Sequence, residues 1–210
     1  MRVRPITFSA EDIRALQASR KSILHLPLEV VFPQPVEPGD LFWVREAAYI
    51  SSRHFTNPNS ASHPEGRMVG YAVNMDANAV AAATVKLGIK RTAADRMPQF
   101  ASRFTLIVEA TAEISLDQIT ETEARKAGIW FDGHHYRGGR HSVYGTLNRH
   151  RTALDAFRDE WSSMYMDTSY SPHRDPRILR VSFTAAALNV DEVLARQHRS
   201  TVLDAEGPTV

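Results

Sequence analysis

Residues 96–103 read Arg-Met-Pro-Gln-Phe-Ala-Ser-Arg, and residues 38–46 read Pro-Gly-Asp-Leu-Phe-Trp-Val-Arg-Glu. The Pro-Gly-Asp sequence of the second stretch is typical of a turn. The apolar and aromatic run that follows it, Leu41 to Arg45, predicts a β-strand. Each stretch ends in a charged residue at or near one end of an apolar strand.

The rest of the chain predicts strands mixed with separated helices. Apolar residues alternate with polar ones from Arg103 to Glu113, which predicts a long central strand. Capping boxes beginning at Ser9 and Thr120 predict two helix starts. Because the pattern has no regular strand-helix-strand rhythm, we expect the α+β class. The natural closure is a small, mostly antiparallel β-barrel with flanking helices and a helical insertion.

Composition limits the classes of protein that fit this sequence. The 210 residues include no cysteine, which excludes disulfides and thiolate ligands and suits a cytoplasmic protein. The first residues lack the apolar core of a signal peptide, and no window approaches 18 continuous apolar residues, so we expect no membrane association. The net charge is only +1, so any nucleic-acid-binding face must be local.

The order of motifs resembles the ASCH domains of the PUA-like superfamily, in particular the larger proteins of phage and bacterial genomes. The matching motifs are 4–9, 20–22, 38–46, 97–103, 119–129 and 157–161, followed by a closing strand near Phe183. The resemblance implies a PUA-like β-barrel over residues 1–186, with an insertion at about 51–96. Residues 187–210 would form a C-terminal helix and a loose tail. It also implies a cleft beside the first helix and RNA, a nucleoside or a modified base as ligand.

One branch of this family removes the acetyl group from N4-acetylcytidine with a Lys, a Thr and a Glu. The Lys corresponds to Lys21, whereas the Thr corresponds to Leu24 and the Glu falls near Ala127. Two of the three roles are therefore replaced. Lys21 could still contact a phosphate or polarise a carbonyl, or it could only complement the end of a helix. Because we expect its side chain to be exposed, Lys21→Ala should weaken nucleotide binding with little loss of stability.

Further candidate ligand-binding residues accompany Lys21. Trp43 and Arg45 share one face of a strand and could stack on a base and meet a phosphate, or they could be a core Trp and its solvent-reaching neighbour. Glu46 could orient Lys21 or pair with Arg103. Arg103 itself could be a phosphate contact or a structural tie. The full set of predicted ligand-binding residues is Lys21, Ser22, Trp43, Arg45, Glu46, Pro98, Ser102 and Arg103.

Residues 132–151 form a loop rich in glycine, histidine and arginine. Its four arginines stand against one aspartate, which favours a nucleic-acid contact, although a solvated loop has the same composition. The cations are Arg137, Arg140, Arg149 and Arg151. The spacing of His134, His135 and His141 matches no zinc motif, so we expect no metal and no cofactor.

These observations favour an RNA- or nucleotide-binding module with a PUA-like cleft. An enzyme acting on RNA or a modified nucleoside, a ribonuclease or an amidohydrolase with Lys21 as its essential cation, is the first alternative. A protein-interaction role with a vestigial cleft is the second. Nucleic-acid affinity that falls with salt distinguishes the first two from the third.

Overall fold

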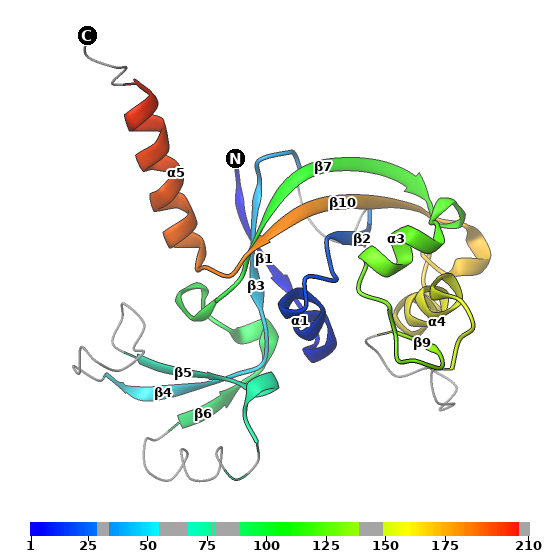
Figure 1. Ribbon diagram of the computed structural model, residues 1–210, viewed down its shortest axis with the longest axis horizontal. Helices are drawn as coiled ribbons and strands as arrows, with labels where there is room; N and C mark the ends of the chain where they lie inside the picture. Colours follow the sequence, from blue (N-terminus) through cyan, green and yellow to red (C-terminus); the bar gives the residue numbers. More distant parts are fainter. Residues whose placement is uncertain (29–33, 55–66, 77, 79–88, 139–148, 206–210) are drawn as a thin grey trace. The chain divides into compact units, whose positions relative to one another are not determined.

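The computed structural model describes residues 1–28, 34–54, 67–76, 78, 89–138 and 149–205. Its strands are β1 (Val3–Thr7), β2 (Ile23–Pro27), β3 (Leu41–Arg45), β4 (Ala48–His54), β5 (Arg67–Tyr71), β6 (Ile89–Thr92), β7 (Thr105–Ser115), β8 (Trp130–Phe131), β9 (Tyr136–Arg137) and β10 (Arg177–Ala186). Its helices are α1 (Ala10–Gln17), α3 (Glu121–Lys126), α4 (Ala153–Tyr165) and α5 (Val190–Ala205), with short 3-10 turns between elements (Figure 1).

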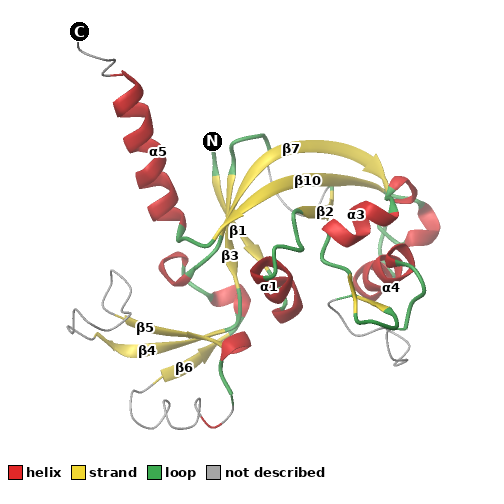
Figure 2. Cartoon of the chain, viewed as in Figure 1, coloured by secondary structure: helices red, strands yellow, loops and turns green. Residues whose placement is uncertain are grey.

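The α+β class is confirmed, and the pairing is mostly antiparallel (Figure 2). The strands form three sheets, with the orders β1-β3-β7-β10-β2, β5-β4-β6 and β8-β9. β1 runs parallel to β3, with Val3 opposite Leu41. Because β1 and β2 are the two ends of the first sheet, the described strands form open sheets and no closed barrel.

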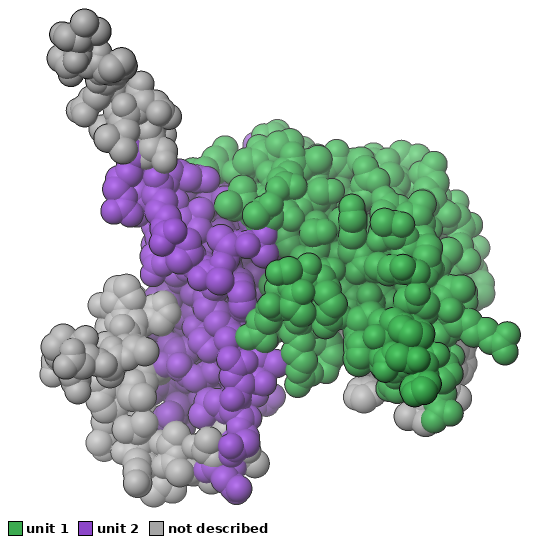
Figure 3. Space-filling model, viewed as in Figure 1, with its two compact units in different colours: residues 1, 9–40, 107–184 green, residues 2–8, 41–106, 185–210 purple. Residues whose placement is uncertain are grey.

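The chain divides into two compact units, shown in Figure 3. Unit 1 comprises Met1, Ser9–Asp40 and Ile107–Thr184, and unit 2 comprises Arg2–Phe8, Leu41–Leu106 and Ala185–Val210. Each unit thus combines segments that lie far apart in the sequence, and the division into a domain over residues 1–186 and a C-terminal tail stays a prediction.

Unit 1 has a core between α3, α4 and the strands. Trp161 on α4 is 1% exposed and its indole donates a hydrogen bond to the carbonyl of Tyr170 at 2.8 Å. Phe157 on the same face of α4 joins this cluster, together with Ile129 and Ile178. Burying such apolar side chains supplies the main stabilisation of the unit. The spacing of Leu154, Phe157, Trp161 and Met164 predicts one apolar stripe on this helix, and Phe157 and Trp161 of that stripe are buried.

Local sequence rules explain where the helices begin. Ser9 caps α1 and exchanges hydrogen bonds with Asp12, and Thr120 does the same with Glu123 at the start of α3. Each box satisfies backbone N–H groups that would otherwise lack partners. After α3, Gly128 adopts a φ of 111°, which a side chain would strain. Both predicted capping boxes are confirmed.

Unit 2 contains β1 and β3 and the three-stranded sheet of β4, β5 and β6. Leu41, Phe42 and Val44 of β3 are at most 1% exposed, as expected for an apolar strand. The helix α5 begins after Asn189, whose Oδ1 accepts a hydrogen bond from the Asp191 N–H at 2.9 Å. A helix in this C-terminal segment was predicted, and α5 extends from Val190 to Ala205. Of the predicted insertion at about 51–96, residues 55–66, 77 and 79–88 lie outside the described residues.

Candidate functional site

Lys21 of unit 1 is held in place rather than exposed. Its ammonium lies 3.0 Å from the Asp12 Oδ1 and donates a hydrogen bond to the carbonyl oxygen of Ala127. Only 9% of the Lys21 side chain is accessible. The expectation of an exposed charge is therefore wrong. Because removing Lys21 would leave the partly buried Asp12 carboxylate without its counter-charge, we now expect Lys21→Ala to lose stability.

The partners of Lys21 come from the first helix and from the end of α3. Lys21 and Ala127 also form an isolated antiparallel backbone bridge, and the adjacent Ser22 N–H donates to the Lys126 carbonyl at 2.9 Å. Leu24 is a buried core residue on β2. The carboxylate that meets Lys21 is thus Asp12, which the sequence analysis treated only as part of a capping box.

The charge of Lys21 affects two neighbouring titratable groups. Burial alone would raise the pKa of Asp12, but the ammonium of Lys21 and hydrogen bonds from Ser9 outweigh it, so the pKa is lowered below the ordinary 3.8. Burial and the same ammonium lower the pKa of His25 to about 4. His25 packs edge-on against Phe157, and within the described chain neither of its buried ring nitrogens has a hydrogen-bond partner. His25 is therefore neutral at pH 7.

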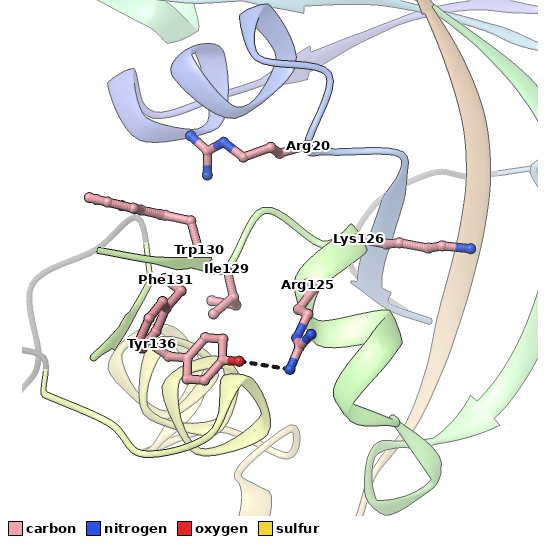
Figure 4. A pocket seen from close by; sticks show the side chains of 7 residues that line it. All are labelled: Arg20, Arg125, Lys126, Ile129, Trp130, Phe131 and Tyr136. Atoms are coloured by element: carbon pink, nitrogen blue, oxygen red, sulfur yellow. Dashed lines mark hydrogen bonds between the residues drawn. The ribbon is translucent and has the colours of Figure 1, made fainter. Parts of the chain in front are cut away.

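Unit 1 contains a hollow of about 470 Å³ (Figure 4). It is built from the end of α3 and the hairpin of β8 and β9, in which Trp130 pairs with Arg137 and Phe131 with Tyr136. Between these strands, the Asp132 carboxylate accepts the N–H groups of His134 and His135 at 2.9 and 2.7 Å and closes the turn. The described residues that line the hollow are Arg20, Arg125, Lys126, Ile129, Trp130, Phe131 and Tyr136.

Two cation–aromatic pairs form the walls of this hollow, which we call the aromatic pocket. The guanidinium of Arg20 lies 5.6 Å from the centre of the Trp130 ring, and that of Arg125 lies 5.2 Å from the Tyr136 ring. Phe131 lies beside Tyr136, with ring centres 5.1 Å apart. Trp130 and Phe131 remain 37% and 54% exposed, which is unusual for such large apolar side chains.

Arg125 is oriented by a network that reaches α4. Glu121 accepts the N–H groups of Ala153 and Leu154 at 2.9 Å each and pairs with Arg125 at 3.0 Å. Arg125 in turn donates to the Tyr136 hydroxyl at 2.7 Å. Burial opposes ionisation of Glu121, but the two backbone N–H groups and Arg125 together lower its pKa. Lys126 contributes charge at the margin, since Figure 4 shows its side chain directed away from the aromatic rings.

The predicted strand residues of unit 2 form a structural cluster. Arg103 donates two hydrogen bonds of 2.8 Å to the two carboxylate oxygens of Glu46. Its guanidinium lies 3.9 Å from the centre of the Tyr71 ring, and burial raises the pKa of Tyr71 to about 12. Glu46 therefore pairs with Arg103, one of the two partners considered for it, and Arg103 acts as the structural tie.

Ser102 and Pro98 shape the segment before β7. The Ser102 hydroxyl is buried and lies 3.0 Å from the carbonyl oxygens of Val44 and Phe104. Pro98 precedes a 3-10 turn over Gln99–Ala101. The hydroxyl is thus engaged with the backbone in the position where a base or phosphate contact was predicted.

Trp43 and Arg45 show the arrangement expected of a core Trp and its neighbour. Trp43 is 9% exposed, and the Arg45 guanidinium lies 5.9 Å from its ring. Arg45 also donates to the carbonyl of Asp95 at 2.9 Å. With its ring covered, Trp43 presents little surface on which a base could stack.

The predicted basic loop is only partly described. Arg137 pairs with Asp132, whose pKa is lowered by the N–H groups of His135 and His134 and by that guanidinium. Arg149 and Arg151 are exposed, and Arg140 lies outside the described residues. In the part of the chain that the structure describes, no group of His, Asp and Glu side chains could hold a metal ion, and no helix could cross a membrane.

Comparisons with protein-family models, with curated proteins and with solved structures found no match for this chain. Sequence analysis missed the aromatic pocket, although a signal was present: Trp130 and Phe131 come directly before Asp132-Gly133, a typical hairpin turn pair. Two adjacent aromatic residues on a short hairpin strand cannot both point into one core.

Proposed function

We propose that this chain is an RNA- or nucleotide-binding module whose ligand site is the aromatic pocket of unit 1. The observation that carries the proposal is the pair of cation–aromatic walls, Arg20 with Trp130 and Arg125 with Tyr136. Exposed aromatic rings stack on nucleobases, and guanidinium groups contact phosphates or stack alongside them. None of the described lining residues is acidic, so the pocket favours an anionic ligand.

The size of the pocket fits this assignment. Its volume of about 470 Å³ lies in the range of small-molecule sites. Base stacking on an aromatic side chain contributes about 1–3 kcal/mol. Arg20 adds a second cation. Among the described residues its guanidinium makes one long hydrogen bond, of 3.5 Å, to the Gly128 carbonyl, so it remains available to a phosphate.

Membership of the ASCH family and a PUA-like architecture remain part of this proposal. They are supported by the order of motifs along the chain and by the α+β class. Turnover of a modified nucleoside is the less favoured function. The ammonium of Lys21 is engaged by Asp12 and by the Ala127 carbonyl, and Leu24 offers no polar atom beside it.

The proposal is tested by titrating AMP, GMP, CMP and UMP into the protein and following the heat of binding by calorimetry, and by following the anisotropy of a short labelled single-stranded RNA. Trp130→Ala should weaken binding by about tenfold or more, which corresponds to about 1.4 kcal/mol. Arg20→Gln should also weaken it. Arg14→Gln, which removes an exposed arginine of α1 already paired with Glu11, is the matched control.

Equal affinity of wild type and Trp130→Ala for every ligand would refute the pocket assignment. Absence of any nucleotide or RNA binding by the wild type would favour a protein-interaction role instead. Because Trp130 and Arg20 lie outside the buried core, thermal unfolding of these variants should stay close to wild type.

A further inference from the structure

The charged residues of the three-stranded sheet of unit 2 that are arginine, lysine, aspartate or glutamate are all positive. Strands β4, β5 and β6 read Ala-Tyr-Ile-Ser-Ser-Arg-His, Arg-Met-Val-Gly-Tyr and Ile-Lys-Arg-Thr. They contain Arg53, Arg67, Lys90 and Arg91 and no acidic residue. The chain as a whole has a net charge of only +1, so this sheet concentrates positive charge that is balanced elsewhere. We call it the basic sheet.

The cations at one edge of the basic sheet are exposed, and the described residues place no carboxylate in an ion pair with them. β6 is an edge strand, and its Lys90 and Arg91, together with Arg96 just beyond it, are exposed. Over the described ranges no carboxylate forms an ion pair with these three. In unit 1, by contrast, most arginines are paired with a carboxylate, as in Arg125–Glu121, Arg137–Asp132, Arg158–Asp117, Arg177–Glu113 and Arg180–Glu123.

The register of the sheet spreads this charge over both faces of the edge. Lys90 is opposite Ile50 and Arg91 is opposite the half-buried Tyr49, so the two cations project to opposite faces. A single lysine on an edge strand is explained if it prevents the strand from pairing with other chains. A run of unpaired cations on both faces goes beyond that requirement and suits a flexible polyanion that passes along the edge.

We propose that the basic sheet binds the phosphate backbone of single-stranded RNA, as a contact separate from the aromatic pocket. This inference rests on the proposed function and specifies single-stranded RNA as the ligand. The pocket would bind a base of the RNA, and the sheet would bind its phosphates. Neutralising phosphates with lysine and arginine releases counterions, so the contact depends on salt and not on sequence. The sheet gives no reason for a free mononucleotide to bind it.

The test compares two double variants of unit 2 that each remove two exposed cations. Lys90→Ala with Arg91→Ala removes the edge of the basic sheet, and Arg196→Ala with Arg199→Ala removes two exposed arginines of α5. Anisotropy of a labelled RNA of about 12 nucleotides is measured between low and moderate salt. Mononucleotide binding is followed in parallel by tryptophan fluorescence, and thermal unfolding checks that both variants are folded.

The sheet variant should bind RNA at least about fivefold more weakly at low salt, and its log–log salt dependence should be shallower by about 1.4. Its mononucleotide affinity should equal that of wild type. The α5 variant should match wild type in every measurement. Charge reversal, Lys90→Glu with Arg91→Glu, should weaken RNA binding further.

The outcomes separate this inference from the pocket assignment. Wild-type RNA affinity and salt dependence in the sheet variant would overturn the inference while leaving the pocket intact. RNA binding that depends on Lys90 and Arg91 but not on Trp130 would support the basic sheet and remove the pocket. Binding to phosphatidylserine vesicles without binding to RNA would overturn the inference in favour of a membrane surface. A protein that binds neither probe would refute both.

Discussion

The carboxylate of Glu46 accepts both of its hydrogen bonds of 2.8 Å from one guanidinium, that of Arg103, 57 residues away in the chain. Glu46 is 3% exposed and follows β3, whereas Arg103 lies two residues before the start of β7. A bidentate pair of this kind fixes both position and angle. Within unit 2 it joins the two stretches, 38–46 and 96–103, that dominate the sequence pattern. The charged residues at the ends of the two stretches therefore bind each other.

Arg103→Ala should therefore destabilise the fold. It leaves the buried Glu46 carboxylate without a partner, and breaking a buried pair from one side costs about 3 kcal/mol of unfolding free energy. Urea denaturation at pH 7 measures this loss. Arg177→Ala is the control, because the Arg177–Glu113 pair is largely exposed and should contribute less than about 1 kcal/mol. Equal stability of the two variants would show that Arg103 is free for another role.

Asp12 and Lys21 predict a loss of stability in acid. The pKa of Asp12 is lowered in the folded state relative to 3.8, so its ionised form stabilises the fold above that pH. This contribution is lost as the pH falls below about 4 towards the folded-state pKa. Asp12→Asn should unfold more readily at pH 6 but lose less stability between pH 5 and 3 than wild type. Parallel pH profiles for the two proteins would contradict the role given to this pair.

His25 predicts a separate loss at higher pH. Its pKa is about 4 in the folded state and 6.5 ordinarily, so the unfolded chain binds a proton between these values that the folded chain does not. Unfolding free energy should therefore fall by roughly 3 kcal/mol as the pH drops from 6.5 to 4. His25→Leu should flatten this interval and leave the decline below pH 4 in place. His173→Leu, at an exposed position, is the control and should keep the wild-type profile.

Sequence reasoning worked where structure is decided by neighbouring residues. The boxes at Ser9 and Thr120, the strand after Gly39 and the apolar face of α4 all follow from spacing within a few residues. These features depend on local hydrogen bonding and on periodicity, and both can be read from one segment.

The candidate site could not be assembled in this way. Lys21 was singled out, but its partner Asp12 is defined by the packing of α1 against the end of α3. Trp43 was left open between base stacking and a core position, and Ser102 was predicted to contact the ligand; both are buried. Exposure of Trp130 and Phe131 depends on which hairpin face the rest of unit 1 covers. Such burial is a property of tertiary packing, and a single sequence does not encode it in a local pattern.

Asn189 joins the start of α5 to residues 99–102 of unit 2. Its side-chain amide donates to the carbonyl oxygens of Gln99, Phe100 and Ser102 at 2.9, 3.2 and 2.9 Å, and the neighbouring Val190 is fully buried. Asn189→Ala should therefore lower the unfolding free energy by about 2 kcal/mol, because three buried or part-buried carbonyls lose a hydrogen bond from this amide. Calorimetry of this variant beside His198→Ala, an exposed change on the same helix, measures the effect.

A chain that ends after Ala187 should lose more stability than Asn189→Ala, since it also removes the buried Val190 and Val193. It further removes Leu188, whose carbonyl accepts a hydrogen bond of 2.9 Å from the Thr105 hydroxyl. A truncated chain that melts at the wild-type temperature would restore the sequence-based view of a dispensable tail. A melting temperature that falls below that of Asn189→Ala would show that α5 is part of the core of unit 2, as these contacts require.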